Sequence, residues 1–323
     1  MRMSRFLISS LLLPVLLGAC QTAAVGPSAG PAHTCRFLLT YDDGPSARRD
    51  YNPTLDILRQ LESNDVQPHI KALFFVQTRN KNGGGDEYGQ AVLRYQHENG
   101  HVLGLHSGTQ RGHIRHTQMP PGELEASLRD GRNDLRAITG EAPAFIRPTF
   151  WGYNDQTLDL YTLNDLKMLL TDVNNRDGTR FHNIFGFRQR LRAELLRTRR
   201  AVERGALPQY LGHTPVIVTF HDLNTITAAN MAGYLRILVE EATAVGLPLA
   251  DKPFYDDARE IAGAAALRTV SPKPATAVAR KPAPQGDTAA AETAWVANVE
   301  RQVEPSKPVL INFSAAEPAP ILR

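Results

Sequence analysis

This chain of 323 residues has few cysteines, a small net charge and no long apolar run. There are two cysteines, Cys20 and Cys35, so the stability of the fold must come mainly from a hydrophobic core. The formal charge of +3 falls to +1 without Arg2 and Arg5, which argues against a nucleic-acid-binding protein. The apolar run Phe6–Leu17 is too short to span a bilayer as a permanent helix.

The N-terminus predicts an exported, lipid-anchored protein. A short basic start followed by Phe6–Leu17 is typical of a signal peptide over residues 1–19. The run ends in Leu17-Gly18-Ala19-Cys20, which resembles the lipobox of bacterial lipoproteins; an ordinary signal peptide with an incidental cysteine is the alternative. A lipid on Cys20 would hold the chain to a membrane and leave Cys35 as a lone, buried thiol. By the same resemblance, Gln21 indicates the periplasmic face of the outer membrane.

Composition divides the rest of the chain into three parts. Residues 20–34 are small and contain Gly and Pro, as in a flexible tether. Residues 263–323 are rich in Ala and Pro and are expected to be mostly disordered, because they cannot bury enough apolar surface to offset their ordering entropy. Between them, residues 35–262 alternate apolar strands with amphipathic helices. This alternation predicts an α/β domain with a parallel sheet, in the form of a distorted (β/α)7-type barrel.

Six polar residues share one position relative to the expected strands: each lies just past the carboxyl end of an apolar segment. They are Asp42, Asp43, His106, Arg147, Asp172 and His221. In parallel α/β folds the carboxyl ends of the strands meet at one face, where functional sites are built. The sequence therefore predicts one site that contains these side chains.

Five motifs that contain most of these residues occur in the order of a known family. They are Thr40–Pro45 (TYDDGP), Lys71–Val76 (KALFFV), Gly100–Ser107 (GHVLGLHS), Arg147-Pro148 and Val216–Asp222 (VIVTFHD). Over roughly residues 35–250 the chain resembles the polysaccharide deacetylases, carbohydrate esterase family four. The resemblance implies a divalent metal, zinc by default with cobalt, nickel or manganese also compatible. It assigns Asp43 and two histidines as metal ligands, Asp42 as general base and His221 as general acid.

The resemblance also implies supporting roles. Arg147 would pair with the base carboxylate, Asp172 would accept a hydrogen bond from the catalytic histidine, and the backbone N–H of Phe150 would bind the oxyanion. Trp151 is either a platform for a sugar ring or a packed wall residue. Thr219 replaces an apolar residue and predicts a slightly more polar pocket for the acetyl methyl group.

The second metal histidine is where the chain departs from the family. The family has H-[ST]-x-x-H, whereas His106-Ser107-Gly108-Thr109 is followed by Gln110. Gln110, His113 and His116 are the candidates. His113 fits best, because the apolar positions and the Glu-Leu pair that follow have the family's spacing if residues 110–112 are an insertion. Since residues seven apart on a regular helix lie about 10 Å apart, this segment cannot be helical.

These residues predict a hydrolase that removes N-acetyl groups from an envelope polymer of acetylated amino sugars, either peptidoglycan or poly-N-acetylglucosamine. Two alternatives stay open. If the altered histidine spacing destroys the metal site, the domain would bind saccharide without turnover. The same chemistry could also hydrolyse O-acetyl esters or a small amide.

Overall fold

Seven parallel strands form the central sheet of the computed structural model, which describes residues 33–177 and 184–272. The predictions for the signal peptide, Cys20, most of the tether and nearly all of the tail lie outside these residues. The strand order is β6-β7-β1-β2-β3-β4-β5. The bounds are β1 Thr34–Asp42, β2 Leu73–Gln77, β3 Val102–Ser107, β4 Phe145–Ile146, β5 Lys167–Leu169, β6 Val173–Asn174 and β7 His213–His221.

The two ends of this sheet are consecutive in the chain. Between β5 and β6 lie only residues 170–172, and the link from Leu169 to Val173 can span at most about 14 Å. Seven strands laid flat would separate the outer two by about 29 Å. The sheet therefore has to curve until its edges approach, which confirms the predicted distorted barrel. Two further strands extend it: β8 (Leu249–Phe254) pairs with β1, and β9 (Thr269–Val270) pairs antiparallel with β5.

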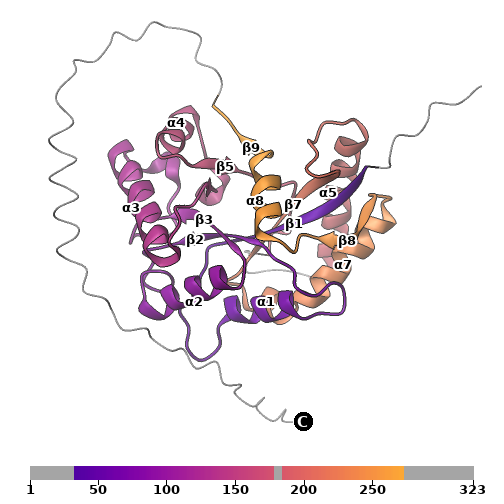
Figure 1. Cartoon of the computed structure of the whole chain (residues 1–323), viewed down its shortest axis with the longest axis horizontal. Helices are drawn as coiled ribbons and strands as arrows, with labels where there is room; N and C mark the ends of the chain where they lie inside the picture. The colour runs from indigo at the N-terminus through magenta and orange to yellow at the C-terminus, as the bar shows by residue number, and fades with distance from the viewer. Residues whose placement is uncertain (1–32, 178–183, 273–323) are drawn as a thin grey trace, which may run out of the picture. The chain divides into compact units, whose positions relative to one another are not determined.

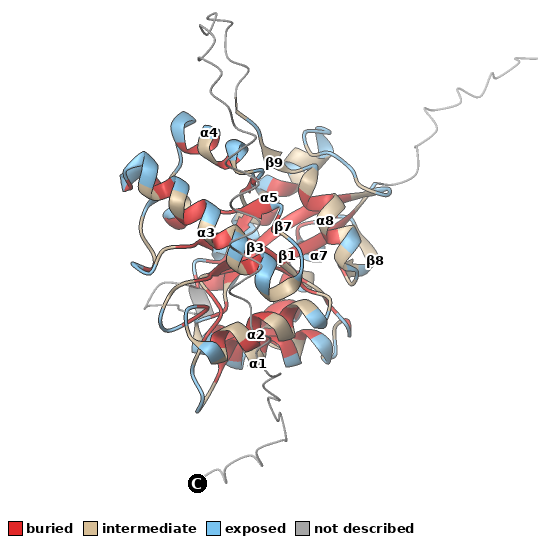
Figure 2. Ribbon diagram, turned by 60° about the vertical axis from the view of Figure 1, so that its left-hand side comes forward, coloured by how far each residue is buried: buried red, intermediate tan, exposed pale blue. Residues whose placement is uncertain are grey.

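Helices cover the outside of the sheet. In Figure 1, α1 and α2 lie together below the central strands, and α3 and α4 lie on one side of them. Figure 2 shows the buried residues on the strands and on the inner sides of the helices, with exposed residues on the outer sides. None of the described helices combines the length and apolar composition that crossing a membrane requires. The bounds are α1 Pro53–Glu62, α2 Glu87–Glu98, α3 Pro121–Thr139, α4 Asp155–Leu163, α5 Ile184–Glu203, α6 Thr225–Ala229, α7 Met231–Ala244 and α8 Ala258–Ala266, with short 3-10 helices at His116–Gln118 and Thr149–Trp151.

The core is built on β1, which is buried along almost its whole length. Its middle residues, Phe37–Leu39, are apolar and fully buried, as expected for a central parallel strand covered on both faces. Tyr41 stacks on Phe74 with ring centroids 4.8 Å apart. Cys35 is fully buried in the same cluster, as predicted, and burial raises the pKa of its thiol to about 12.

The fold continues beyond residue 262, where the sequence placed the start of the tail. Helix α8 runs to Ala266, and β9 follows it. Ile261, Ala264 and Ala265 are fully buried against the sheet. The alanines that resembled tail composition are small side chains that let this helix approach the sheet closely.

Candidate active site

Asp43, His106 and His113 meet at the carboxyl ends of β1 and β3. Oδ1 of Asp43 lies 3.3 Å from Nε2 of His106 and 3.2 Å from Nε2 of His113, and the two Nε2 atoms are 3.2 Å apart. Ligands placed about 2.0–2.1 Å from one ion would lie about 2.8–3.0 Å apart at octahedral angles and about 3.3–3.4 Å apart at tetrahedral angles. The spacing of the three ligand atoms therefore fits a single divalent metal ion. Within the described residues this is the one group of three such side chains with metal-binding spacing.

The local chemistry of these side chains also fits a metal. Oδ1 of Asp43 is buried and has no hydrogen-bond partner among the described residues. Although burial opposes its charge, the close approach and charge of His106, together with the charges of His113 and His221, hold the pKa of Asp43 well below its usual range. Nδ1 of His106 lies 2.8 Å from the carbonyl oxygen of Arg147. With a proton on Nδ1, Nε2 keeps its lone pair for coordination.

His113 is the candidate that the structure brings to the cluster. The loop after β3 reverses at Gly112, whose φ of 78° is left-handed, and so carries His113 back towards His106. Gln110 is exposed in this loop. His116 is buried elsewhere, with Nδ1 2.7 Å from the hydroxyl of Tyr161. Burial lowers the pKa of His113, which favours the neutral form that binds metals.

Asp42 pairs with Arg147, as predicted. Both side chains are buried, and Nη1 of Arg147 donates to Oδ1 of Asp42 at 2.8 Å. The same Nη1 lies 2.7 Å from Oγ1 of Thr40 and 3.1 Å from Oγ1 of Thr219. Thr219 is not among the residues that line the cavity described below, and its hydroxyl lies 2.9 Å from that of Thr40 inside the barrel; the more polar acetyl pocket stays a prediction.

The acidic partner of His221 is Asp177, and the prediction of Asp172 is wrong. Nδ1 of His221 lies 2.8 Å from Oδ1 of Asp177, whose Oδ2 also accepts from the backbone N–H of His221 at 3.0 Å and from Thr227 at 2.7 Å. Asp172 instead accepts from the N–H of Ile217 and pairs with Arg268.

The error has a geometric cause. Asp172 lies before β6, level with Ile217, which is four residues and about 13 Å below His221 along β7. Asp177 lies after β6, level with His221. The relevant strand has only two residues, so the sequence pattern placed the strand end too early.

Asp177 changes the acidity of His221. Burial disfavours the imidazolium, but the hydrogen bond and charge of Asp177, with the charges of Asp42 and Asp43, outweigh it and raise the pKa of His221 to about 9. The raised pKa favours the imidazolium, which is the form that can donate a proton.

A cavity of about 400 Å³ opens above these groups. It is lined by Asp42, Asp43, His106, His113, Arg115, Pro148, Phe150, Trp151, Asn174, Arg176 and His221. Sequence reasoning did not assign Arg115, Asn174 or Arg176 to the site. Asn174 ends the two-residue strand β6, and the two arginines lie on loops, so none of them belongs to a periodic pattern.

Backbone strain is concentrated around this cavity. Four non-glycine residues that line it have left-handed φ values: Asp43 at 80°, Phe150 at 55°, Trp151 at 60° and Arg176 at 53°. Each such conformation costs about 1–2 kcal/mol, and strained residues of this kind cluster at functional sites.

The ring of Phe150 packs on a proposed metal ligand, a contact that the sequence did not predict. Its ring, 45% exposed, stacks on His113 with centroids 4.1 Å apart and an interplanar angle of 22°. Its backbone N–H lies in the first turn of a 3-10 helix, where such groups have no partner within the helix. The oxyanion role stays a prediction. The ring of Trp151 lies 5.1 Å from the guanidinium carbon of Arg147 and also lines the cavity, so it is both a wall and an accessible surface.

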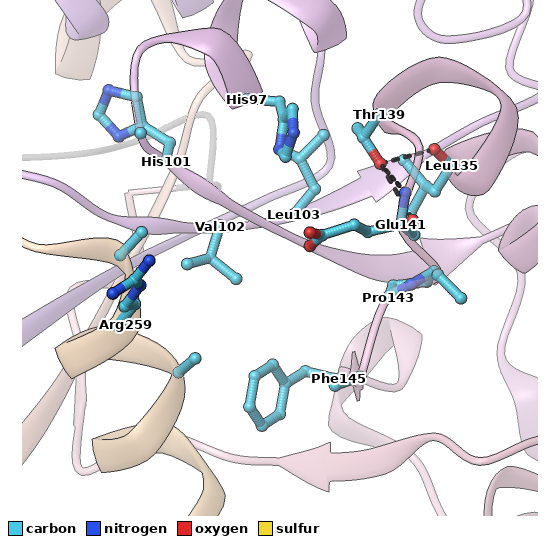
Figure 3. A pocket seen from close by; sticks show the side chains of 15 residues that line it. His97, His101, Val102, Leu103, Leu135, Thr139, Glu141, Pro143, Phe145 and Arg259 are labelled. Atoms are coloured by element: carbon cyan, nitrogen blue, oxygen red, sulfur yellow. Dashed lines mark hydrogen bonds between the residues drawn. The ribbon is translucent and has the colours of Figure 1, made fainter.

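A second cavity, of about 280 Å³, lies at the opposite, amino-terminal ends of β3 and β4 (Figure 3). Leu103, Phe145 and Leu135 contribute much of its wall, and the hydroxyl of Thr139 is used in hydrogen bonds to Leu135 and Glu141. The metal-type cluster lies at the other end of the sheet, so the chemistry belongs to the first cavity.

The chain is similar to known proteins over part of its length. The family model described as polysaccharide deacetylase matches residues 30–169. Similar solved structures include a family 4 carbohydrate esterase from Streptomyces lividans in complex with acetate (18% identity, TM-score 0.49, covering 75% of this chain and 100% of that chain). Others are the chitin deacetylase of Colletotrichum lindemuthianum (20%, TM-score 0.49, 68% and 86%) and a peptidoglycan deacetylase of Bacillus subtilis (22%, TM-score 0.45, 67% and 87%). No curated protein is similar enough to this chain to count as a match.

Proposed function

We propose that this chain is a member of the polysaccharide deacetylase family, whose model matches residues 30–169, and that it is a metal-dependent hydrolase that removes N-acetyl groups from an envelope amino-sugar polymer. One observation carries the proposal. The metal-type cluster Asp43, His106 and His113 lies in one cavity with the ion-paired Asp42 and with His221, whose pKa is raised.

The residues divide the work of amide hydrolysis. Asp43, His106 and His113 would hold the ion, most simply zinc, which when bound polarises the acetyl carbonyl and makes water a better nucleophile. Asp42, fixed by Arg147, takes a proton from the attacking water as its oxygen bonds to the carbonyl carbon.

His221 completes the reaction. Its Nε2 gives a proton to the sugar nitrogen as the carbon–nitrogen bond breaks, so that acetate and a free amine leave. Asp177 holds Nδ1 and stabilises the imidazolium before the transfer. An amine must be protonated to leave, whereas the alcohol of an ester leaves more readily. A histidine held in its protonated form therefore favours N-acetyl over O-acetyl substrates.

The three proposed metal ligands, the proposed base and the proposed acid lie together in one cavity. This weighs against the alternative that the domain only binds saccharide. The envelope location rests on the predicted signal peptide and on the predicted lipid at Cys20. Zinc as the metal and an amino-sugar polymer as the substrate belong to the same proposal. Membrane attachment is tested by Cys20→Ala, which should move the protein from the membrane fraction to the soluble fraction.

The test of the activity is acetate release from N-acetylglucosamine oligomers, with and without a chelator. The chelator should abolish the activity of the wild type, and adding zinc should restore it. The variants Asp43→Ala and His113→Ala should be inactive. His116→Ala is the matched control and should still bind one metal ion per chain. A wild type that binds no metal and releases no acetate from any acetylated polymer would overturn the proposal.

A further inference from the structure

We infer that one face of helix α5 binds the phosphate groups of an anionic membrane surface; this rests on the envelope location in the proposed function. The face consists of Arg190, Arg197, Arg200 and Arg204, and we call it the arginine face. All four residues are exposed, and none of them lines the catalytic cavity. The reaction therefore leaves them free for another partner.

The helical repeat brings the four arginines together. Arg197 lies seven residues, or two turns, from both Arg190 and Arg204. Arg204 directly follows α5, and its N–H still donates to the carbonyl oxygen of Arg200 at 3.2 Å. At about 100° per residue, the four side chains leave the helix within about 80° of one another, in a row about 21 Å long. Leu195, on the opposite side of α5, is fully buried in the core.

The other three arginines of α5 are neutralised by acids. Nη1 of Arg188 lies 3.0 Å from one carboxylate oxygen of Glu241 on α7, and Nε of Arg192 lies 2.7 Å from the other. Arg199 pairs with Glu203 at 2.6 Å. These pairs are explained by packing between α5 and α7 and by contacts within α5, so they need no external partner.

The arginine face, in contrast, has an excess of positive charge. Arg197 lies 3.2 Å from Oε1 of Glu194, whose Oε2 accepts a hydrogen bond from the backbone N–H of Asn174. Among the described residues, the other three arginines of the face form no ion pair. The side chains between them, Gln189 and Ala193, are uncharged. Four guanidinium groups thus share one carboxylate, and their remaining N–H donors match the paired oxygens of phosphate groups.

The position of the arginine face favours a membrane as the source of these phosphates. Because β6 and β7 are parallel neighbours, α5 between them runs back to the amino-terminal end of the sheet. There β7 begins at His213, whose Nδ1 lies 2.7 Å from Oγ1 of Thr34, the first residue of β1. Residues 21–33 separate Thr34 from the predicted lipid at Cys20, so a lipid there would keep this end at most about 50 Å from the membrane.

Attachment through the arginine face would leave the catalytic cavity accessible. α5 packs on β6 and α7 at the side of the barrel, whereas the cavity opens at the carboxyl ends of the strands. A barrel that lies on this side would present its cavity along the membrane surface. The negative surface potential of anionic phospholipids attracts arginines near the surface, each by about fivefold in binding.

The test measures binding to vesicles by co-sedimentation. The protein is the chain from Gln21 onwards, which keeps every described residue and carries no lipid, so that binding reports the domain. The vesicles contain phosphatidylcholine alone or phosphatidylcholine with an equal amount of phosphatidylglycerol. We expect binding to the anionic vesicles to be about 100-fold tighter or more, and to weaken as salt is added.

The double variant Arg197→Ala/Arg204→Ala should weaken binding to the anionic vesicles about 20-fold. Arg129→Ala/Arg136→Ala is the matched control, because it removes two exposed arginines with the same seven-residue spacing from α3 and should bind like the wild type. In Figure 1, α3 lies to the left of the central strands and α5 to their right. Equal binding of the wild type to both vesicles, or an equal loss in both double variants, would overturn the inference.

Soluble polyphosphate separates the membrane from a dissolved polyanion. If it binds the wild type as tightly per phosphate as the anionic vesicles do, and the α5 variant loses both, the membrane assignment is wrong. The vesicle assay needs neither lipid nor substrate. Failure of vesicle binding while acetate release and Cys20-dependent membrane attachment persist would therefore refute the arginine face and leave the proposed function standing. Vesicle binding without acetate release would be a failure of the proposed activity alone.

Discussion

Replacing Asp177 by asparagine tests how the site makes an acid of His221. Raising the pKa of His221 from 6.5 to about 9 corresponds to about 3 kcal/mol in favour of the imidazolium. Burial acts against the charge, so the carboxylates supply at least this amount, and Asp177 is the one in direct contact. Asparagine keeps the shape but removes the charge, and its amide can turn its NH₂ towards Nδ1. We expect kcat to fall about 10²–10⁴-fold, as for loss of a positioned general acid.

The assay is acetate release from N-acetylglucosamine oligomers with saturating metal between pH 5 and pH 10. A general acid must be protonated, so wild-type kcat should decline on the alkaline side as pH rises through the pKa of His221. That value is about 9 without metal and lower with a dication nearby. In Asp177→Asn the decline should move to lower pH.

Asp172→Asn is the matched control for this experiment. It breaks the contact with Arg268 and should lower thermal stability without moving the alkaline limb. The reasoning would be refuted if Asp172→Asn moved the limb while Asp177→Asn, shown to be folded by circular dichroism, did not.

Three further outcomes follow from the geometry. His113→Ala should reduce the amount of bound metal, measured by atomic absorption, to less than a tenth of the wild-type amount. His116→Ala should keep one metal ion per chain. Loss of metal in His116→Ala but not in His113→Ala would make His116 the ligand in place of His113. Zinc at 100 times its dissociation constant should stabilise the fold by about 2.7 kcal/mol in thermal unfolding, and this gain should vanish in Asp43→Ala. Gly44→Ala should lower the free energy of unfolding by about 1–3 kcal/mol in urea, since its Cβ would lie 2.0 Å from Oδ2 of the buried Asp222; an unchanged midpoint would contradict that contact.

The fold and the centre of the site could be predicted because they rest on strong strands. Asp42, Asp43, His106 and His221 end or directly follow β1, β3 and β7, which are long and apolar. Parallel strands bring such ends to one face, so their meeting needed no information about loops.

What could not be predicted depends on short strands and loops. β5 has three residues and β6 has two, too few to show a pattern. Asp172, which follows the apolar segment that contains β5, was therefore taken for the partner of His221, and Asp177, which follows β6, was missed. Arg115 and Arg176 are positioned by a stacking contact and a left-handed backbone, respectively. Neither kind of contact leaves a regular signal in the sequence.

Arg147 contacts both the proposed base and the seam where the barrel closes, so it links the curvature of the sheet to the chemistry of the site. Its Nη1 donates to Asp42 and Thr40 on β1, while Nε and Nη2 donate to the carbonyl oxygens of Leu169 and Leu170, where the chain crosses from β5 towards β6. One fully buried cation thus joins β1 to the seam of the barrel. Removing it would leave the Asp42 carboxylate and two carbonyl groups buried without this partner, which typically costs about 3–5 kcal/mol. Lysine has one ammonium group and cannot reach these groups in the same planar arrangement. Arg147→Lys should therefore lower both the urea midpoint and kcat, and a variant that lost activity at unchanged stability would show that closure and base positioning are separable.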